Sequence, residues 1–119
     1  MTTTMTSELR HQTSELKVVT ECRLLYFMVY DQVKDRKDYY LWNHALKSII
    51  SIGSNLAEGN KRGKKEQIQF ILISKGSIAE FEFQYSLLNI KSEEIPLQID
   101  KIKAMTHGLW SAVRGQMSK

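Results

Sequence analysis

The sequence contains one proline and one cysteine in 119 residues. Because proline breaks helix interiors, a chain with only Pro96 can form long uninterrupted helices. The single Cys22 excludes a disulfide within the chain and is typical of proteins from a reducing compartment. We therefore expect a cytoplasmic protein that is held together by packing and not by cross-links.

Long apolar runs are also absent. The longest, residues 24–30, is far shorter than the about 20 residues that a membrane helix needs. The first ten residues lack the apolar centre of a signal peptide. With 42% hydrophobic and 25% charged residues, the chain is expected to form one domain over 1–119, with 1–6 as a frayed polar leader and no membrane association.

Four segments carry apolar residues at spacings of three and four, which predicts helices with one buried face. Charged or glycine-containing stretches at 34–38, 60–65 and 89–94 separate these segments. Ser92 is a suitable cap for the last helix, and Pro96 fits its first turn. Helices with such short connections lie antiparallel, so we predict an all-α, antiparallel up-down-up-down four-helix bundle.

Four local features carry more specific predictions. Asp38 is expected to cap the second helix. Gly59, where the second apolar segment ends, is expected to adopt the left-handed conformation that terminates helices. Gly76 lies inside the third segment, where glycine lowers helix stability by about 1 kcal/mol relative to alanine. Its presence despite this cost predicts that a neighbouring helix approaches closely there. The inner face of the third helix is predicted to carry Ile68, Leu72, Ala79, Phe83, Leu87 and Ile90, beside Ile71, Ile78 and Tyr85.

The turn at 60–65 is rich in cations, namely Lys61, Arg62, Lys64 and Lys65. In the predicted topology this turn shares one end of the bundle with both termini, and therefore with Arg10, His11, Arg114 and Lys119. With a net charge of +4, such a basic end is expected to attract the phosphates of a nucleic acid through counterion release. The competing interpretation is a solvated turn whose cations complement a helix C-terminus. The turn contains no aromatic residue on which an unpaired base could stack.

The same hairpin carries a set of polar residues. Asn55 and Glu58 share one helix face, as do Ser77 and Glu80. Folding the hairpin brings Glu80 level with Lys47, which predicts an ion pair, and Asn55 is expected to cross-link helices or subunits. No histidine, cysteine or second acid stands at a catalytic spacing from these carboxylates, so we interpret the set as structural.

Residues suited to enzymatic chemistry are scattered. The histidines at 11, 44 and 107 form no metal-binding pair. Cys22 lies within an apolar face and is predicted to be a buried thiol. The glycines at 53, 59 and 63 follow a helix and not a strand, which excludes the usual phosphate-binding loops. We expect no cofactor, no metal and no catalytic activity, with an uncharacterised hydrolase as a remaining alternative.

The first two helices are more apolar than a bundle core requires. The surplus includes several aromatic residues: Tyr26, Phe27, Tyr30, Tyr39, Tyr40 and Trp42. Exposed apolar patches usually mark interfaces, which favours self-association. The alternative is that these rings cover the ends of the bundle.

The hairpin also carries a family resemblance. Ser-Ile-Gly-Ser-Asn-Leu-Ala-Glu-Gly at 51–59, the basic turn, and Gly-Ser-Ile-Ala-Glu at 76–80 resemble the four-helix-bundle proteins encoded in intervening sequences of 23S rRNA genes. That family includes relatives of the accessory protein of diversity-generating retroelements. The resemblance covers about residues 40–90. Gly53 stands where the family usually has proline, and residues 44–47 replace a Gln-x-Arg-Arg run and so lack one cation. The resemblance implies a four-helix bundle and a ring-shaped homo-oligomer, with a pentamer favoured, but no settled activity.

These inferences combine into a functional prediction. We expect a non-enzymatic, oligomeric helical bundle whose basic end binds RNA, DNA or a ribonucleoprotein. The alternative is a protein–protein scaffold or accessory partner, for example of a reverse transcriptase, that does not bind nucleic acid directly.

Overall fold

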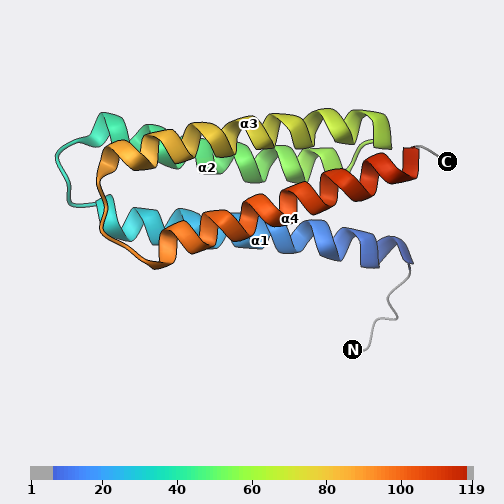
Figure 1. Ribbon diagram of the computed structural model, residues 1–119, viewed down its shortest axis with the longest axis horizontal. Helices are drawn as coiled ribbons and strands as arrows, with labels where there is room; N and C mark the ends of the chain where they lie inside the picture. The colour runs from blue at the N-terminus through green and yellow to red at the C-terminus, as the bar shows by residue number, and fades with distance from the viewer. Residues whose placement is uncertain (1–6, 118–119) are drawn as a thin grey trace.

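The computed structural model describes the backbone of residues 7–117 and the side chains of residues 17–117. It contains four helices: α1 (Ser7–Val33), α2 (Tyr39–Asn60), α3 (Lys64–Leu88) and α4 (Glu94–Met117). No strand occurs between residues 7 and 117, so the predicted all-α four-helix fold is confirmed. Figure 1 shows successive helices running in alternate directions along the longest axis. None of these helices is both long and apolar enough to cross a membrane.

Small polar side chains line the contact between α2 and α3. The hydroxyl of Ser74 donates to the carbonyl of Ile52 at 3.0 Å, and the hydroxyls of Ser51 and Ser77 lie 2.8 Å apart. Nearer the start of α2, Ser48 donates to the side chain of Gln84. Because the partner number on α3 falls as the number on α2 rises, the two helices are antiparallel. Short side chains let the two backbones approach closely while each buried hydroxyl keeps a hydrogen bond.

Two glycines in this hairpin behave differently from the prediction. Gly59 lies inside α2, which continues to Asn60, and no glycine between residues 7 and 117 has a positive φ. A Cβ on Gly59 would come within 2.8 Å of the Cβ of Phe70, so this glycine allows α3 to pack against α2. A Cβ on Gly76 would meet nothing within 4 Å. The left-handed cap at Gly59 and the close approach at Gly76 were therefore both wrong.

The face of α3 that enters the core differs in part from the prediction, which is confirmed for Ile71 and Ile78. The buried residues of α3 are Gln67, Ile71, Ser74, Ser77, Ile78, Phe81 and Leu88. By contrast, Leu72 is 44% exposed and Phe83 is 65% exposed, and Ala79 and Leu87 are exposed as well. Apolar residues occur on nearly every side of α3, so their spacing could not identify the inner face. Ser74 and Ser77, which contact α2 through hydrogen bonds, lie on the same buried face as Phe81.

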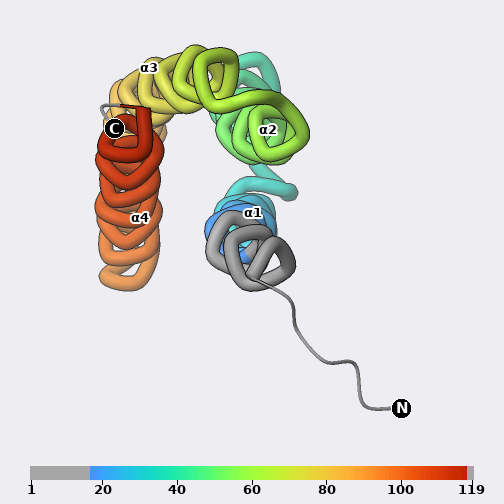
Figure 2. Tube along the Cα trace, turned by 90° about the vertical axis from the view of Figure 1, so that its right-hand side faces the viewer, coloured from blue at the N-terminus to red at the C-terminus, as the bar shows by residue number. Residues whose placement is uncertain are grey.

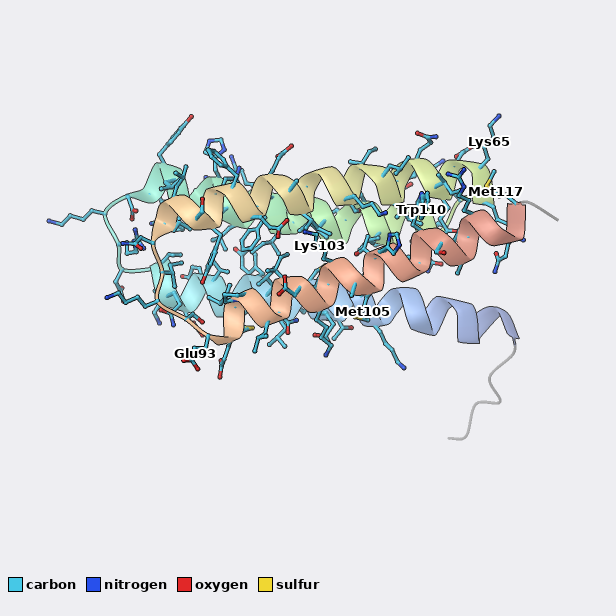
Figure 3. The ribbon with its side chains drawn as sticks, viewed as in Figure 1. Lys65, Glu93, Lys103, Met105, Trp110 and Met117 are labelled. Atoms are coloured by element: carbon cyan, nitrogen blue, oxygen red, sulfur yellow. The ribbon has the colours of Figure 1, made fainter. Side chains whose placement is uncertain are left out.

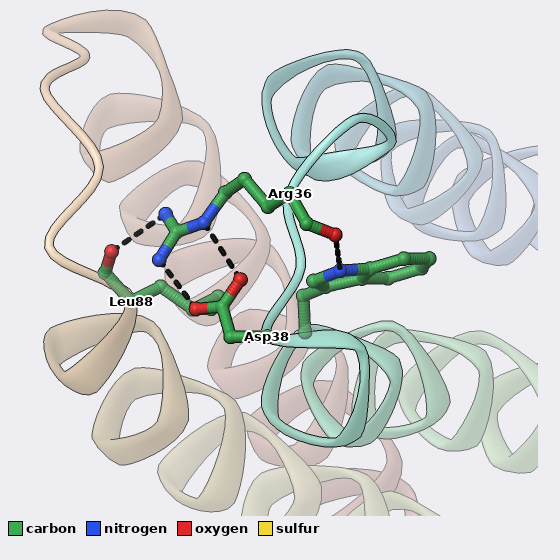
Figure 4. Close-up of polar contacts among 4 residues, drawn as sticks. Arg36, Asp38 and Leu88 are labelled. Carbon is green, nitrogen blue, oxygen red and sulfur yellow. Dashed lines mark hydrogen bonds and ion pairs between the residues drawn. The ribbon is translucent and has the colours of Figure 1, made fainter.

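The end of the bundle opposite the α2–α3 turn is fastened by Arg36 (Figure 4). Its guanidinium binds both carboxylate oxygens of Asp38 and donates to the carbonyl of Leu88 at 2.7 Å. The indole of Trp42 donates to the Arg36 carbonyl at 3.3 Å. Asp38 precedes α2 but makes no side-chain capping bond, so its predicted capping role was wrong, because Arg36 occupies the carboxylate. The hydrogen bond from Arg36 lowers the pKa of Asp38.

The connection before α4 agrees with the prediction. The hydroxyl of Ser92 accepts a hydrogen bond from the backbone of Ile95 at 3.1 Å, and Pro96 lies in the first turn of α4. Seen end-on in Figure 2, the helices follow an arc in the order α1, α2, α3, α4. The outer two helices are joined where Glu21 accepts hydrogen bonds from Gln98 at 2.6 Å and Lys101 at 3.1 Å.

The two glycines provide a matched test of the packing between α2 and α3. We expect Gly59→Ala to destabilise the protein by about 1–3 kcal/mol, because its methyl group overlaps the rigid Cβ of Phe70. Gly76→Ala should stabilise it by up to about 1 kcal/mol, since alanine favours the helix and the site is open. Urea unfolding followed by circular dichroism measures both. A shift of the same sign in the two variants would contradict this account of the hairpin.

Candidate nucleic-acid interface

The turn between α2 and α3 is short and well defined. The backbone amides of Lys61 and Arg62 donate to the carbonyls of Glu58 and Gly59, which closes the last turn of α2. Gly63 then adopts an extended conformation and precedes the first residue of α3. The backbone thus reverses direction within three residues. All four predicted cations of this turn have exposed side chains.

Arg62 is the only one of these cations that forms an ion pair with a described residue. Its guanidinium lies 2.6 Å from Glu58 and 3.8 Å from Glu66, and its central carbon lies 5.7 Å from the ring centroid of Phe70. Both acidic side chains near the turn are therefore engaged by Arg62. It follows that Arg62 braces the turn, and that the unbalanced positive charge belongs to the three lysines.

The lysines differ in their relation to the helix dipoles. Lys61 follows the C-terminus of α2, where a positive charge is stabilised. Lys64 and Lys65 are the first two residues of α3, where the positive end of the dipole opposes them by about 0.3–1 kcal/mol each. Gly63 at the N-cap has no side chain to accept hydrogen bonds from the first amides of α3. A simple solvated turn accounts for Lys61 but not for two cations at an uncapped helix N-terminus, which is an arrangement suited to anions.

The remaining predicted cations come from the chain ends. Figure 3 shows Lys65 and Met117 together at one end of the bundle and Glu93 at the other. Arg114 lies in the last turn of α4, so the structure brings it to the end that carries the lysines. The side chains of Arg10, His11 and Lys119 lie outside the described residues.

Sequence reasoning missed an aromatic residue next to this end. The ring of Trp110 has the Lys75 ammonium 4.4 Å and the Arg114 guanidinium 5.1 Å from its centroid. His107 stacks on the same ring at 5.7 Å, and its Nδ1 accepts a hydrogen bond from Lys75 at 3.2 Å. Only the packing of α3 against α4 brings Lys75 to the other three. The spacing of three and four from 107 to 114 was the readable signal, and it lies outside the turn itself.

The polar residues of the hairpin are held mainly within their own helix. Asn55 donates to the carbonyl and hydroxyl of Ser51, one turn earlier in α2, and so does not cross-link helices within the chain. Glu58 pairs with Arg62. Ser77 is buried and is the one member that bridges the two helices, through Ser51.

The predicted ion pair between Lys47 and Glu80 is absent from the described part of the chain. Both side chains are exposed. The contact line between α2 and α3 passes through Ser48 and Ser51 instead, which leaves Lys47 and Glu80 on the solvent side of it. The prediction placed the two residues at the correct level along the helix axes, but it placed them on the face where α2 and α3 meet and not on the solvent side.

The predicted burial of the Cys22 thiol is confirmed. Cys22 is 3% exposed, and burial, followed by the charge of Glu21, raises its pKa to about 12. A thiol with this pKa is protonated at neutral pH and is a poor nucleophile. Among residues 17–117, no three histidine, cysteine, aspartate or glutamate side chains lie close enough to hold a metal ion.

Two separate apolar surfaces remain exposed. The first, here called the α1–α2 surface, borders a groove of about 410 Å³ and consists of Leu24, Phe27, Tyr30 and Ile50. The second, the α3 stripe, consists of Leu72, Ile73, Phe83 and Leu87. Tyr39 and Tyr40 are exposed as well, at the start of α2. Trp42 is only 9% exposed and belongs to the core, so its assignment to the exposed surplus was wrong.

The model of the family described as 23S rRNA-intervening sequence protein matches residues 14–108. This span contains the hairpin and the basic turn, whereas Trp110 and Arg114 lie just beyond it. No curated protein matches the chain. Because the family model covers most of the sequence, this four-helix protein belongs to the 23S rRNA-intervening sequence protein family.

Proposed function

We propose that the protein is a non-enzymatic, cytoplasmic homo-oligomer that binds nucleic acid, alone or in a ribonucleoprotein, through Lys61, Lys64 and Lys65. One observation carries the proposal. These lysines are exposed and form no ion pair with a described residue, because Arg62 occupies both nearby acids. Two of them also stand at the positive end of α3, where an anion would relieve the unfavourable interaction with the dipole.

The expected binding is electrostatic. Lysines on an exposed turn neutralise phosphates and release condensed counterions, which gives affinity without reading bases. A ring of subunits would place several such turns on one assembly. Weak contacts at each turn would then add up through avidity.

Salt dependence tests the site directly. The variant Lys61→Gln, Lys64→Gln, Lys65→Gln removes three cations and leaves the Arg62 brace intact. In fluorescence-anisotropy titrations with labelled duplex DNA, we expect the slope of log K against log salt to shrink by about 2 to 3, at about 0.9 per lost phosphate contact. Affinity at low salt should fall accordingly.

A second triple variant controls for net charge. Lys34→Gln, Lys37→Gln, Lys91→Gln removes the same number of exposed cations from the opposite end of the bundle. Its slope should stay close to that of the unmodified protein. Equal slopes for the two variants would show that binding follows overall charge and not this turn. No binding of duplex DNA or structured RNA at low salt would rule out the nucleic-acid function.

Self-association is proposed from the two apolar surfaces. They lie on different helices: one borders a groove lined by α1 and α2, and the other is a row of exposed apolar side chains on α3. If the α1–α2 surface of one subunit packs against the α3 stripe of its neighbour, the contact is head-to-tail. Head-to-tail contacts close into rings when the rotation permits. We favour a pentamer, as the family resemblance suggests.

Complementary mutations distinguish this arrangement from a symmetric dimer. We expect Phe27→Asp and Phe83→Asp each to break the assembly into monomers, because each places a charge in one of the two surfaces. Mixing the variants should restore a heterodimer, since each retains the surface that the other has lost. Native mass spectrometry measures the stoichiometry. Leu97→Asp, an exposed leucine outside both surfaces, should leave the oligomer intact, and loss of assembly in this control would show that the effect is not specific.

The alternative function is a protein–protein scaffold or accessory partner, for example of a reverse transcriptase, with no direct nucleic-acid contact. The extent of the exposed apolar surface favours it, because a partner could cover one of the two surfaces. A scaffold would retain its partner when the three turn lysines are replaced and would lose it when Phe27 or Phe83 is charged. The proposed nucleic-acid binder would show the opposite dependence on the lysines.

A further inference from the structure

A groove of about 530 Å³ runs between α3 and α4. Its lining residues come equally from the two helices: Lys75, Ile78, Ala79, Glu82, Asp100, Lys103, Ala104 and His107. The apolar part of this lining is provided by the small or branched side chains of Ile78, Ala79 and Ala104. Volumes of this order accommodate small organic ligands.

The charges on the rim of the groove are unequally distributed. Lys75 and His107 lie at the end nearer the basic turn, where Trp110 and Arg114 continue the same surface along α4. Glu82 and Asp100 lie at the other end, where Lys103 approaches Glu82 at 3.3 Å. Figure 3 shows Trp110 between Lys103 and the end that carries Lys65. The groove therefore has a cationic end, an apolar middle and an end with carboxylate acceptors.

Trp110 organises the cationic end. Two positively charged groups, from Lys75 and Arg114, lie within 5.1 Å of its ring centroid. Cation–π attraction holds them close together even though like charges repel. Lys75 forms no ion pair with a described carboxylate. A bound anion would therefore be attracted by two charges that are already in position.

We propose that this groove binds one unpaired nucleotide of the nucleic acid that is held at the basic turn. Its phosphate would contact Lys75 and Arg114, and its base would pack on Ile78, Ala79 and Ala104. Exocyclic amino groups of the base would donate to the carboxylate of Asp100. This inference rests on the proposed function and adds the class of substrate, which is a strand with unpaired bases. A paired base in a duplex is stacked and cannot enter a groove of this size without leaving its helix.

The distance to the turn sets the length of strand required. Lys75 lies ten residues after Lys65 in α3, which corresponds to about 15 Å at 1.5 Å per residue. A strand that keeps the stacked rise of 3.4 Å per nucleotide covers this distance in about five nucleotides. Stacked oligonucleotides clearly shorter than this can occupy the turn or the groove, but not both.

Filling the groove tests the proposal without changing charge. Ala104→Leu places a larger side chain on the apolar floor, and Ala112→Leu makes the same change at an exposed position of α4 outside the groove. The probes are a ten-nucleotide oligoadenylate, a three-nucleotide oligoadenylate and a ten-base-pair duplex, all measured by anisotropy. We expect Ala104→Leu to weaken binding of the ten-nucleotide strand by about tenfold, because the larger side chain takes the space that the base would occupy. Its affinity for the duplex should not change, and Ala112→Leu should affect binding of none of the three probes.

Tryptophan fluorescence provides an independent readout. The sequence contains two tryptophans, and Trp42 is buried at the opposite end, so Trp42→Phe leaves Trp110 as the only tryptophan. We expect the ten-nucleotide strand to quench this signal, and the duplex and inorganic phosphate to leave it nearly unchanged. If Trp42→Phe fails to fold, the difference between the unmodified protein and Trp110→Phe reports the same change.

The outcomes separate the two proposals. Tenfold weakening in Ala104→Leu alone, with quenching by the longer strand only, supports the groove. Equal affinities in the two leucine variants, or quenching as strong with the duplex, would overturn the groove while leaving the basic turn as the binding site. Loss of all binding only in the triple lysine variant would support the turn as the main site, and absence of binding in the unmodified protein would overturn both proposals.

Discussion

The close approach of α2 and α3 is the constraint on which the other features depend. It requires that Gly59 carry no side chain opposite Phe70 and that serines occupy the contact line. Because these serines must face α2, the larger apolar residues of α3 are divided between the core and the outer surface. The same contact fixes the direction in which the basic turn projects. The exposed α3 stripe and the exposed lysines are thus two results of one packing arrangement.

Polar interactions are distributed unevenly along the bundle. At the end opposite the basic turn, the guanidinium of Arg36 is engaged within the fold by Asp38 and by the carbonyl of Leu88. At the basic end, Arg62 performs a related task on a smaller scale and removes the local acids from competition with the lysines. Arg36 therefore joins separate elements of the fold at one end, whereas Arg62 at the other end leaves the neighbouring lysines exposed and without a described ion-pair partner.

The sequence predicted the number and class of the helices, the Ser92 cap and the location of the basic turn, because periodicity and turn composition are local signals. It failed where the answer depends on which neighbour a residue meets. The apolar spacing places Leu72 and Phe83 in the core, because α3 is apolar on most sides. The expected ion pair between Lys47 and Glu80 follows from their level along the two helices, which does not specify the face of the helix on which each side chain lies. The cluster around Trp110 joins Lys75 to residues more than 30 positions later in the chain. No local pattern could report that contact.

The Arg36 contact also bears on the order in which the chain folds. The α2–α3 hairpin joins residues close in sequence and has the lower entropic cost of closure. The hydrogen bond from Arg36 to Leu88 spans 52 residues and needs the end of α3 to be already in place beside the α1–α2 connection. By the same entropic argument, formation of this bond is expected to follow the hairpin. A chain still being synthesised would complete its basic turn before its last helix, and the groove between α3 and α4 would be the last surface to form.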